Sequence, residues 1–369
     1  MIEMDVERLR SVGLTPAMAL VAICSQPVPE SDADDDGAAS PRSLVRVIEV
    51  HRETLQVHDG LHERSVRVLP RLARTLAEQD TAVAVGDWVV LLNDAHGQAW
   101  IHERIAPLSH IARRDADGRR HPVVSNVDTA LLVMGLDDDF NPRRLERFMT
   151  LVQGQGVTPV VVLTKADTVA PDAVDRSVAE LRSRIAAQVD IVAVNGMAPD
   201  TTRVLDAYLA PGQTVVLLGS SGAGKSTLTN ALAGMALQDT GAVREHDSRG
   251  KHTTTSRSLH RLPGGACVID TPGLRTLRPD ADESTLAASF EDIASLALQC
   301  RFRDCRHGDE PGCAVREGVP VDRLRNYHKL LREVRRDTLT AIERQQMTSE
   351  WKARGRAAHV RIKMKRGEV

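Results

Sequence analysis

The chain has few aromatic residues and neither a long apolar run nor a strong net charge. Aromatics make up 2% of its 369 residues, so leucine, valine and alanine must fill the core of a chain that is 42% hydrophobic. No apolar run approaches about 18 residues and the N-terminus lacks a signal-peptide pattern, so we expect a cytoplasmic protein without a membrane partner. The formal net charge of −2 excludes a general electrostatic argument for nucleic-acid binding, so any such surface must be local.

Lysine and cysteine are rare enough for their positions to be informative. The chain has only seven lysines, so a lysine seldom falls inside a nucleotide-binding motif by chance. Of its five cysteines, three fall between residues 300 and 313, which favours a metal site over disulfides in a reducing compartment. Cys24 and Cys267 lie in apolar stretches, and we expect both to be packed.

A glycine-rich stretch between an apolar segment and a helix organises the rest of the chain. Residues 215–218 are predicted to form a buried parallel strand, and helix-forming residues follow from Leu228. The spacing G-x(4)-G-K-S between them is that of a phosphate-binding P-loop, the alternative being an ordinary glycine-rich turn. Its candidate nucleotide-binding residues are Gly219, Ser220, Ser221, Gly222, Ala223, Gly224, Lys225, Ser226 and Thr227.

Each part of a P-loop has a defined task. Glycines let backbone N–H groups converge on the phosphate oxygens, and the N-terminus of the following helix adds positive partial charge. Lys225 is predicted to neutralise the β and γ phosphates, and the Ser226 hydroxyl is placed to coordinate Mg²⁺.

The first 112 residues are predicted to form an extension and a small barrel. Residues 1–43 combine a short amphipathic helix pair with a Pro/Asp/Ser-rich linker over residues 26–43. Residues 44–112 hold short strand-like segments separated by turn signals, which indicates an antiparallel barrel of OB-fold size. Four arginines either line a nucleic-acid-binding face of this barrel or are simply solvated: Arg64, Arg67, Arg71 and Arg74.

Residues 113–280 alternate between strands and helices. Buried strands are predicted over residues 129–135, 157–163 and 190–194, ahead of the P-loop strand. This βαβ alternation indicates an α/β domain with a largely parallel sheet and helices on both faces. Ligands of such sheets bind beyond the carboxyl ends of the strands, where the motifs of this region all fall.

One of these strand ends suits recognition of a guanine base. Thr164, Lys165 and Asp167 belong to a T-K-A-D sequence that directly follows a predicted strand. The Asp167 carboxylate can accept hydrogen bonds from guanine N1–H and N2–H₂, while the Lys165 stem covers the ring face. Adenine has no amine at C2 and leaves the carboxylate unpaired, so the motif favours guanine.

A D-T-P-G strand end at residues 270–273 completes the predicted nucleotide site. Asp270 would hold Mg²⁺ through water, and the Gly273 N–H would sense the γ-phosphate. The polar segment over residues 242–257 is a candidate switch loop, with a solvated surface loop as the alternative; Thr253 or Thr254 within it would close over the metal. Three such motifs in one α/β domain predict a GTPase.

The cysteine cluster predicts a metal site in the last part of the chain. It consists of Cys300, Cys305, His307 and Cys313, after a helix-like stretch over residues 282–298. Such a set fits a closed tetrahedral Cys₃His site, which suits structural zinc, the alternative being free cysteines beside a surface histidine. Beyond residue 321 the chain is predicted to be helical, and the basic run over residues 351–366 suits RNA phosphates or is a solvated helix end.

The order of these motifs resembles that of the circularly permuted GTPases, and in particular the ribosome small-subunit-dependent GTPase A (RsgA/YjeQ) family. T-K-A-D precedes G-S-S-G-A-G-K-S-T, and D-T-P-G comes last, whereas ordinary GTPases place the base motif after the other two. The resemblance covers the barrel with its V-G-D-W-V sequence, the H-T-T-T segment and the cysteine cluster. It leaves out the first 40 residues and the extreme C-terminus.

Three departures from that family pattern affect the expected site. Thr164 stands where asparagine is usual, and Asn195 lies in a V-N-G loop where an S-A-like base contact is usual. Leu274 follows D-T-P-G where many GTPases have a glutamine that orients water. A leucine cannot position the nucleophile, so we predict slow intrinsic hydrolysis that the partner completes. His252 is an alternative for that role, or is an ordinary surface histidine.

The resemblance implies a complete functional hypothesis. After the extension over residues 1–43 we expect an OB-like barrel (44–112), a permuted GTPase domain (113–280) and a zinc-binding helical domain (281–369). It implies GTP, Mg²⁺ and Zn²⁺ as ligands, the small (30S) ribosomal subunit and its rRNA as partners of a monomer, and a role in late subunit maturation. Because D-T-P-G leads into the last domain, a shift there would reorient that domain. Two alternatives stay open: an RNA-binding assembly factor that uses GTP mainly as a conformational ligand, and an ATPase if Thr164 has removed guanine selectivity.

Overall fold

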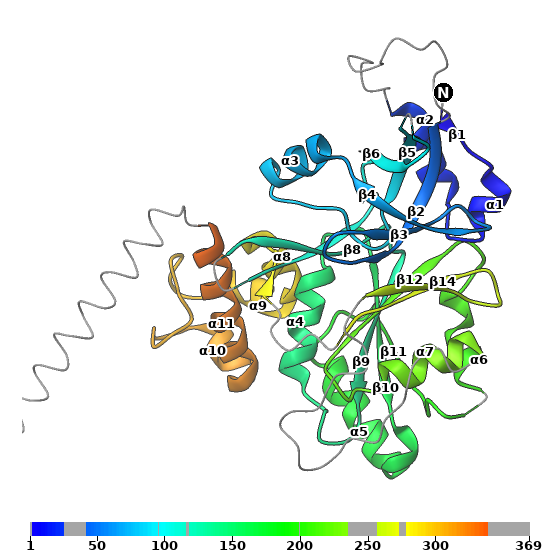
Figure 1. The fold of residues 1–369 in the computed structure, drawn as a ribbon. Coiled ribbons are helices and arrows are strands. Elements are labelled where there is room, and N and C mark those ends of the chain that lie inside the picture. The colour runs from blue at the N-terminus through cyan, green and yellow to red at the C-terminus, as the bar shows by residue number, and fades with distance from the viewer. Residues whose placement is uncertain are drawn as a thin grey trace, which may run out of the picture. The chain divides into compact units, whose positions relative to one another are not determined.

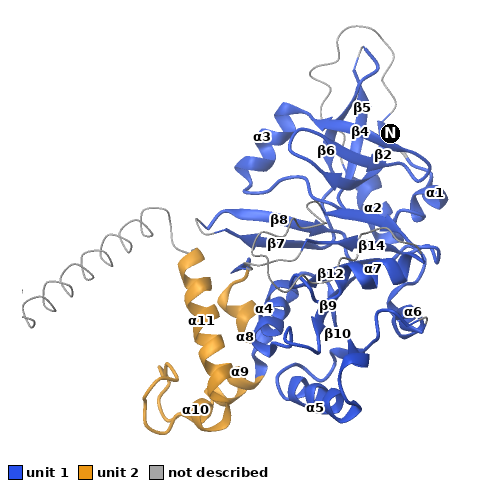
Figure 2. Ribbon diagram, turned by 60° about the horizontal axis from the view of Figure 1, so that its bottom comes forward, with its two compact units in different colours: residues 1–280, 288–291 blue, residues 281–287, 292–369 orange. Residues whose placement is uncertain are grey.

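The computed structural model describes residues 2–25, 42–94, 96–115, 118–198, 200–234, 257–272 and 278–338. The chain divides into two compact units (Figure 2). Unit 1 comprises residues 1–280 and 288–291, and unit 2 comprises residues 281–287 and 292–369.

The core of unit 1 is a sheet whose parallel half carries the nucleotide motifs. Its strands lie in the order β11–β10–β9–β12–β14–β13, and all neighbours are parallel except β13 and β14. Figure 1 labels all of these strands but β13. The strand bounds are β9 Thr129–Gly135, β10 Thr158–Thr164, β11 Asp190–Ala193, β12 Thr214–Gly219, β13 Ser258–Arg261 and β14 Cys267–Asp270. The chain adds β10 and β11 on one side of β9, and β12 and β14 on the other. The strand order therefore reverses between β9 and β12, which is where ligands bind in open α/β sheets.

The central strands are buried on both faces, as their unbroken apolar sequences predict. Alternate residues point to opposite sides of a strand, so Leu132 and Leu218 lie in one hydrophobic cluster while Leu131 and Leu217 lie in the other. Helices cover the sheet: α4 Pro142–Val152, α5 Pro171–Arg182, α6 Thr201–Leu205 and α7 Lys225–Ala233. The start of α4 follows the predicted signals, because Pro142 is its first residue and Asn141 Oδ1 accepts a hydrogen bond from Arg144 N (3.1 Å).

The predicted small barrel is confirmed and has five strands, although two of them pair in parallel where we predict antiparallel neighbours throughout. Its strands follow the order β2–β3–β4–β6–β5, and the β2–β5 pairing closes it. Their bounds are β2 Arg42–Val50, β3 Leu55–His58, β4 Glu63–Val68, β5 Trp88–Asn93 and β6 Ala99–Arg104, with helix α3 Pro70–Glu78 between β4 and β5. The helix was not predicted, although Pro70 at its first turn is a helix-start signal. The four arginines considered for a binding face lie on β4 and α3 and are all exposed.

The N-terminal segment packs beside the barrel. It contains strand β1 Ile2–Glu3 and the predicted helix pair, α1 Val6–Arg10 and α2 Pro16–Cys24. Gly13 lies between the helices with φ +87°, and a Cβ there would meet Arg46 Nη1 at 1.9 Å. The prediction that both isolated cysteines are packed is right for Cys267 and wrong for Cys24, which is exposed. Met18, Ala19 and Ala22 form the buried face of α2, and the last residue of the helix points away from it.

A separate three-stranded sheet joins segments that are far apart in the sequence. Strands β7 His110–Arg114, β8 Arg120–Ser125 and β15 Arg278–Pro279 pair in the order β15–β7–β8. Asp280, just after β15, pairs with Arg114 (2.7 Å) and Arg120 (2.5 Å). The expectation that D-T-P-G leads directly into the last domain is therefore wrong, because β15 adds a strand to a sheet of unit 1 before unit 2 begins.

Unit 2 is helical. Residues 282–298, predicted as one helix-like stretch, contain two helices, α8 Glu283–Ser289 and α9 Glu291–Ala297, of which residues 288–291 belong to unit 1. Helices α10 Ala314–Gly318 and α11 Val321–Thr338 follow. The buried Arg323 on α11 donates two hydrogen bonds to Asp292 on α9 (2.8 and 2.7 Å), which ties these helices together. None of the helices in the described ranges is both long and apolar enough to cross a membrane.

Candidate functional site

Four strand ends meet at one edge of the parallel sheet. Gly135 of β9 is in register with Thr164 of β10, and Gly219 of β12 is in register with Val133 of β9. On the other side of β12, Leu217 is in register with Asp270, the last residue of β14. The same edge therefore carries the T-K-A-D motif, the P-loop and the first residue of D-T-P-G. About 100 residues of sequence separate T-K-A-D from D-T-P-G.

The P-loop has the backbone that its glycines predict. Gly222 (φ +85°) and Gly224 (φ +89°) are both left-handed, and Gly224 directly precedes the first residue of α7. Lys225 is 6% exposed, and its Nζ donates to the carbonyls of Gly219 (3.1 Å) and Ser220 (2.7 Å). Burial lowers the pKa of the Lys225 ammonium, while the nearby Asp270 and Asp139 carboxylates oppose that shift. The ammonium is thus held inside the loop that is predicted to cradle phosphate.

The other P-loop residues follow from these two glycines. Ser220, Ser221, Gly222 and Ala223 form the connection between β12 and α7, and Ala223 is fully buried. Ser226 and Thr227 lie in the first turn of α7 and are partly exposed.

Thr164 joins the base motif to the P-loop. Its Oγ1 is buried and donates to the carbonyl oxygen of Ala223 at 2.6 Å. A Cβ built on Gly224 would lie only 3.2 Å from Thr164 Oγ1, so the P-loop passes close to the Thr164 side chain. The threonine that replaces the usual asparagine thus bonds directly to the backbone of the phosphate loop.

The remaining residues of the base site lie just beyond β10 and β11. Lys165 has a left-handed backbone (φ +60°), and its Nζ pairs with Asp137 Oδ2 at 2.5 Å. Asp167 is exposed on a single 3₁₀ turn, whose Ala166 N–H donates to the Val194 carbonyl (3.3 Å). Its carboxylate is therefore accessible at the strand end where base recognition is predicted.

The V-N-G loop, residues 194–196, lies against the P-loop helix. Asn195 Oδ1 accepts a hydrogen bond from Met197 N at 3.0 Å, which uses its side chain within the loop. A Cβ on Gly196 would come within 3.3 Å of Thr227 Cγ2. The V-N-G loop is thus brought to the nucleotide edge, although the Asn195 amide oxygen is turned into the loop.

The loop after β9 contributes two carboxylates that sequence reasoning missed. Asp137 pairs with Lys165, and Asp139 Oδ1 accepts from Ser220 Oγ of the P-loop at 2.5 Å. Asp139 also pairs with Arg144 in the first turn of α4. Three consecutive aspartates directly after an apolar strand, residues 137–139, were the available signal.

Asp270 ends β14 beside the P-loop strand and is 1% exposed. The next residue, Thr271, donates through Oγ1 to the Leu217 carbonyl at 2.6 Å, which fixes the two strand ends to each other. The predictions for His252, Thr253, Thr254, Gly273 and Leu274 lie outside the described residues. Near Lys225, the hydroxyl of Ser226 and the carboxylate of Asp270 offer the oxygen ligands that Mg²⁺ prefers.

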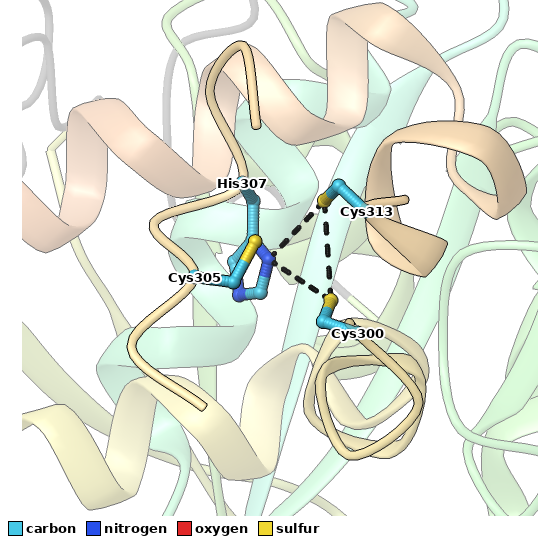
Figure 3. Close-up of side chains that lie close together, drawn as sticks. All are labelled: Cys300, Cys305, His307 and Cys313. Carbon is cyan, nitrogen blue, oxygen red and sulfur yellow. Dashed lines mark hydrogen bonds between the residues drawn. The ribbon is translucent and has the colours of Figure 1, made fainter. Parts of the chain in front are cut away.

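The four predicted metal ligands come together in unit 2 (Figure 3). Their ligand atoms all lie within 4.8 Å of one another. The Cys300 and Cys313 sulfurs are 3.9 Å apart, and His307 Nδ1 is 3.6 Å from the former and 3.5 Å from the latter. Tetrahedral zinc requires S···S and S···N separations of roughly 3.8 and 3.6 Å, given Zn–S and Zn–N bonds of about 2.3 and 2.05 Å. The geometry therefore fits a zinc ion bound by Cys300, Cys305, His307 and Cys313.

Backbone groups shape this centre. Cys313 precedes α10, and its sulfur accepts from Arg316 N at 3.4 Å. The backbone N–H of Val315 lowers the pKa of the Cys300 thiol, which favours the thiolate that binds metal. His307 takes a left-handed backbone (φ +60°), and its carbonyl contacts His328 Nε2 on α11 at 3.3 Å.

Known proteins share both the sequence and the fold. The RsgA GTPase family model matches residues 102–279. Small ribosomal subunit biogenesis GTPase RsgA of Xanthomonas axonopodis pv. citri is 45% identical over 308 residues, which are 80% of this chain and 82% of that protein. The protein of the same name from Xanthomonas campestris pv. campestris is 44% identical over the same coverage.

Two solved structures have a related fold. The structure of YjeQ from Thermotoga maritima aligns with a TM-score of 0.56 and 25% identity, over 79% of this chain and 98% of that one. YloQ, described as a circularly permuted GTPase, aligns with a TM-score of 0.54 and 22% identity, over 83% of this chain and 99% of that one. Together with the motif order and the strand-end geometry, these matches show that the chain belongs to the RsgA family of circularly permuted GTPases.

Proposed function

We propose that this chain hydrolyses GTP in the cytoplasm, as a monomer, and that the small ribosomal subunit and its rRNA stimulate that hydrolysis during late maturation of the subunit. The observation that carries the proposal is the meeting of Lys225, Asp270 and the T-K-A-D residues at one sheet edge. The name shared by the Xanthomonas relatives, small ribosomal subunit biogenesis GTPase, supports the choice of partner.

The residues of the edge divide the work of holding GTP. Asp167 accepts the guanine N–H groups, and the Lys165 stem covers the ring. The P-loop amides and the Lys225 ammonium bind the phosphates and stabilise charge that develops during transfer. The hydrogen bond from Thr164 to Ala223 keeps the base end and the phosphate end in fixed relation.

A magnesium ion, when bound, would neutralise charge on the phosphates and polarise their oxygens. Ser226 and Asp270 are the described residues proposed to hold it, and Thr253 or Thr254 would complete the set. The cysteine cluster is proposed to hold zinc, which would brace unit 2 without entering the reaction.

The proposal is tested by GTP turnover with and without purified small subunits, for wild type beside Lys225→Ala. We expect strong stimulation for wild type, and a loss of about 100-fold or more for the variant, since a buried charge contact to phosphate is removed. Arg176→Ala, which removes an exposed cation on α5 of unit 1, is the matched control and should retain stimulated turnover. Wild-type turnover that does not rise when small subunits are added would contradict the proposal.

One feature favours a second candidate, an RNA-binding assembly factor in which GTP is mainly a conformational ligand. Leu274 follows D-T-P-G, and its side chain cannot orient a water molecule. Under this alternative, subunit binding would depend on whether GTP or GDP is present, while turnover would not change on adding subunits.

A further inference from the structure

Ser258 lies directly opposite Asp270, one of the residues proposed to hold magnesium. The two residues are in register in the antiparallel pairing of β13 with β14. Directly opposite residues of such a pair point to the same face of the sheet, and their Cβ atoms are about 5 Å apart. Ser258 is 7% exposed and Asp270 is 1% exposed. The Ser258 hydroxyl can therefore reach the buried carboxylate, directly or through one water molecule.

The face that these two side chains share is covered by the P-loop helix α7. Val268 precedes Asp270 by two residues and so points the same way, and it lies in one hydrophobic cluster with Leu228 of α7. Leu259, which follows Ser258 and points the other way, lies in the cluster on the opposite face. Ser258 is therefore on the same side of the sheet as the helix that follows the P-loop.

A histidine holds the Ser258 hydroxyl. His260 is two residues along β13, and its Nε2 lies 2.8 Å from Ser258 Oγ. Either atom can donate in this hydrogen bond, depending on which ring nitrogen carries the proton. Burial lowers the pKa of the His260 imidazole, and the largest opposing effect comes from the Asp270 carboxylate. The ring and the carboxylate are therefore close enough to interact electrostatically, on either side of the Ser258 hydroxyl.

The other carboxylate in register with Ser258 is engaged elsewhere. It belongs to Glu49 of the barrel strand β2, and it contacts His51 Nε2 at 3.1 Å. A hydroxyl can donate one hydrogen bond and accept two, so Ser258 keeps capacity beyond its bond to His260. Because Asp270 is buried while 32% of the Glu49 side chain is exposed, a hydrogen bond to Asp270 is the stronger of the two.

We propose that Ser258 is a positioning residue for Asp270, with His260 donating from Nε2 to Ser258 Oγ and the Ser258 hydroxyl donating to the carboxylate. Carboxylates that hold a metal are themselves held by hydrogen bonds, which fix their direction and tune their basicity. The serine–histidine pair thereby keeps Asp270 turned toward the magnesium position. The inference rests on the proposed GTPase function and adds two residues that belong to none of the nucleotide motifs.

The role is tested on the full chain by the binding of a fluorescent, non-hydrolysable GTP analogue with and without Mg²⁺. The magnesium-free buffer contains no chelator, so that the cysteine cluster keeps any metal it holds. For wild type, Mg²⁺ should tighten binding of the analogue. In Ser258→Ala this gain should fall about 10-fold, because loss of a group that orients a metal ligand weakens metal binding by about 10- to 100-fold. Affinity without Mg²⁺ should equal that of wild type.

Further substitutions separate the hydroxyl from the histidine. Ser258→Thr keeps the hydroxyl and suits a strand, so it should restore most of the gain from Mg²⁺. His260→Phe keeps a flat ring without a donor, and should lower the gain by about 2- to 10-fold. In the double variant S258A/H260F the loss should equal that of Ser258→Ala alone, because His260 acts through Ser258.

A second buried serine bonded to a histidine provides the matched control. Ser125 Oγ lies 2.8 Å from His110 Nδ1, and Ser125 ends β8 shortly before β9 begins. It is therefore at the far end of β9 from the strand end that belongs to the nucleotide edge. Ser125→Ala should lower the melting temperature, because buried hydrogen bonds are lost, and should leave the gain from Mg²⁺ at its wild-type value.

A gain from Mg²⁺ in Ser258→Ala equal to that of wild type would overturn the proposal. An equal loss of affinity with and without Mg²⁺ would do the same, because it would indicate a purely structural role, and so would a lost gain in Ser258→Thr. Subunit-stimulated turnover adds a second readout: in Ser258→Ala the KM for Mg²⁺ should rise about 10-fold, with kcat at saturating Mg²⁺ near that of wild type. A wild-type protein that gains nothing from Mg²⁺ would instead contradict the proposed GTPase function itself.

Discussion

The two candidate ligand sites of this protein are built in opposite ways. The nucleotide edge gathers residues from positions 135 to 271, and the sheet brings them together through strand register. The metal centre draws all four ligands from residues 300–313, in loops and the start of a five-residue helix. In the nucleotide edge, the folded sheet positions the site residues. In the metal centre, the bound metal is expected to hold the loop in its folded conformation.

This difference predicts which site tolerates loss of its ligand. Unit 1 has extensive hydrophobic clusters on both faces of its sheet, so it should fold without nucleotide. The segment that holds the cluster, residues 300–313 (the metal loop), has little apolar burial of its own. Phe302 within it is exposed, and so is Leu298 just before it. Small segments of this kind depend on the metal for their stability.

Zinc removal is therefore expected to have the largest effect. Structural zinc contributes about 10–16 kcal/mol of apparent binding free energy in small zinc peptides, and chelation should unfold the metal loop. Cys313→Ser should release zinc and make residues 300–313 sensitive to limited proteolysis, while GTP binding by unit 1 persists. Cys24→Ser, at an exposed cysteine outside the cluster, is the control and should keep both zinc and resistance. If the chelator-treated protein were cleaved at the same rate as the untreated protein, the metal loop would not depend on zinc for its fold.

The next largest effect is expected at the base end of the nucleotide edge. Asp167→Asn should weaken GTP binding by about 100-fold or more, because two charge-assisted hydrogen bonds to guanine are lost. Binding of xanthosine triphosphate should improve in the same variant, since its N1 and C2 groups pair with an amide. Titration calorimetry with both nucleotides measures this, and Asp138→Asn, an exposed neighbour of the edge with the same change in charge, should bind as wild type. An unchanged preference would exclude Asp167 from base recognition.

A smaller effect is expected where the two ends of the edge are joined. Thr164→Val removes the hydroxyl that donates to Ala223 and leaves that buried carbonyl without this donor, at a cost of about 1–3 kcal/mol. Both GTP and GDP should bind more weakly, and the melting temperature should fall by a few degrees. Thr164→Ser keeps the hydroxyl and should behave nearly as wild type. Equal losses in the serine variant would indicate that packing, and not the hydrogen bond, is responsible.

The smallest effect is expected at the contact between the P-loop and Asp139. Ser220→Ala removes one hydrogen bond to a carboxylate that Arg144 also holds, so nucleotide affinity should fall only about 2- to 10-fold. Ser221→Ala, one residue along and exposed, is the matched control for the loop backbone. Stopped-flow release of a fluorescent GDP analogue would resolve the difference; identical release rates would show that the Asp139 contact does not steady the loop.

Local patterns carried most of what could be predicted from sequence. The P-loop strand and helix, the buried parallel strands, the barrel and the cysteine cluster all depend on short-range signals, and the structure has each of them. The placement of Thr164 against Ala223 could not be predicted, because it depends on how closely β10 and the P-loop approach each other in space. The same is true of Asp139 and Ser220, which are 81 residues apart. Cys24 was wrongly expected to be packed, because helix periodicity over nine apolar residues does not show which face is covered.

The buried side chain of Arg46 has a mechanical consequence. It donates to the Val12 carbonyl (2.6 Å), to Thr214 Oγ1 (2.8 Å) and to the Asn126 carbonyl (2.8 Å), so it links the N-terminal helices, the barrel strand β2 and the first residue of β12. Separating any of these would leave a guanidinium without its acceptors in the interior, which is strongly unfavourable. A displacement of the barrel is therefore transmitted through Arg46 to Thr214, the first residue of the strand that leads into the P-loop.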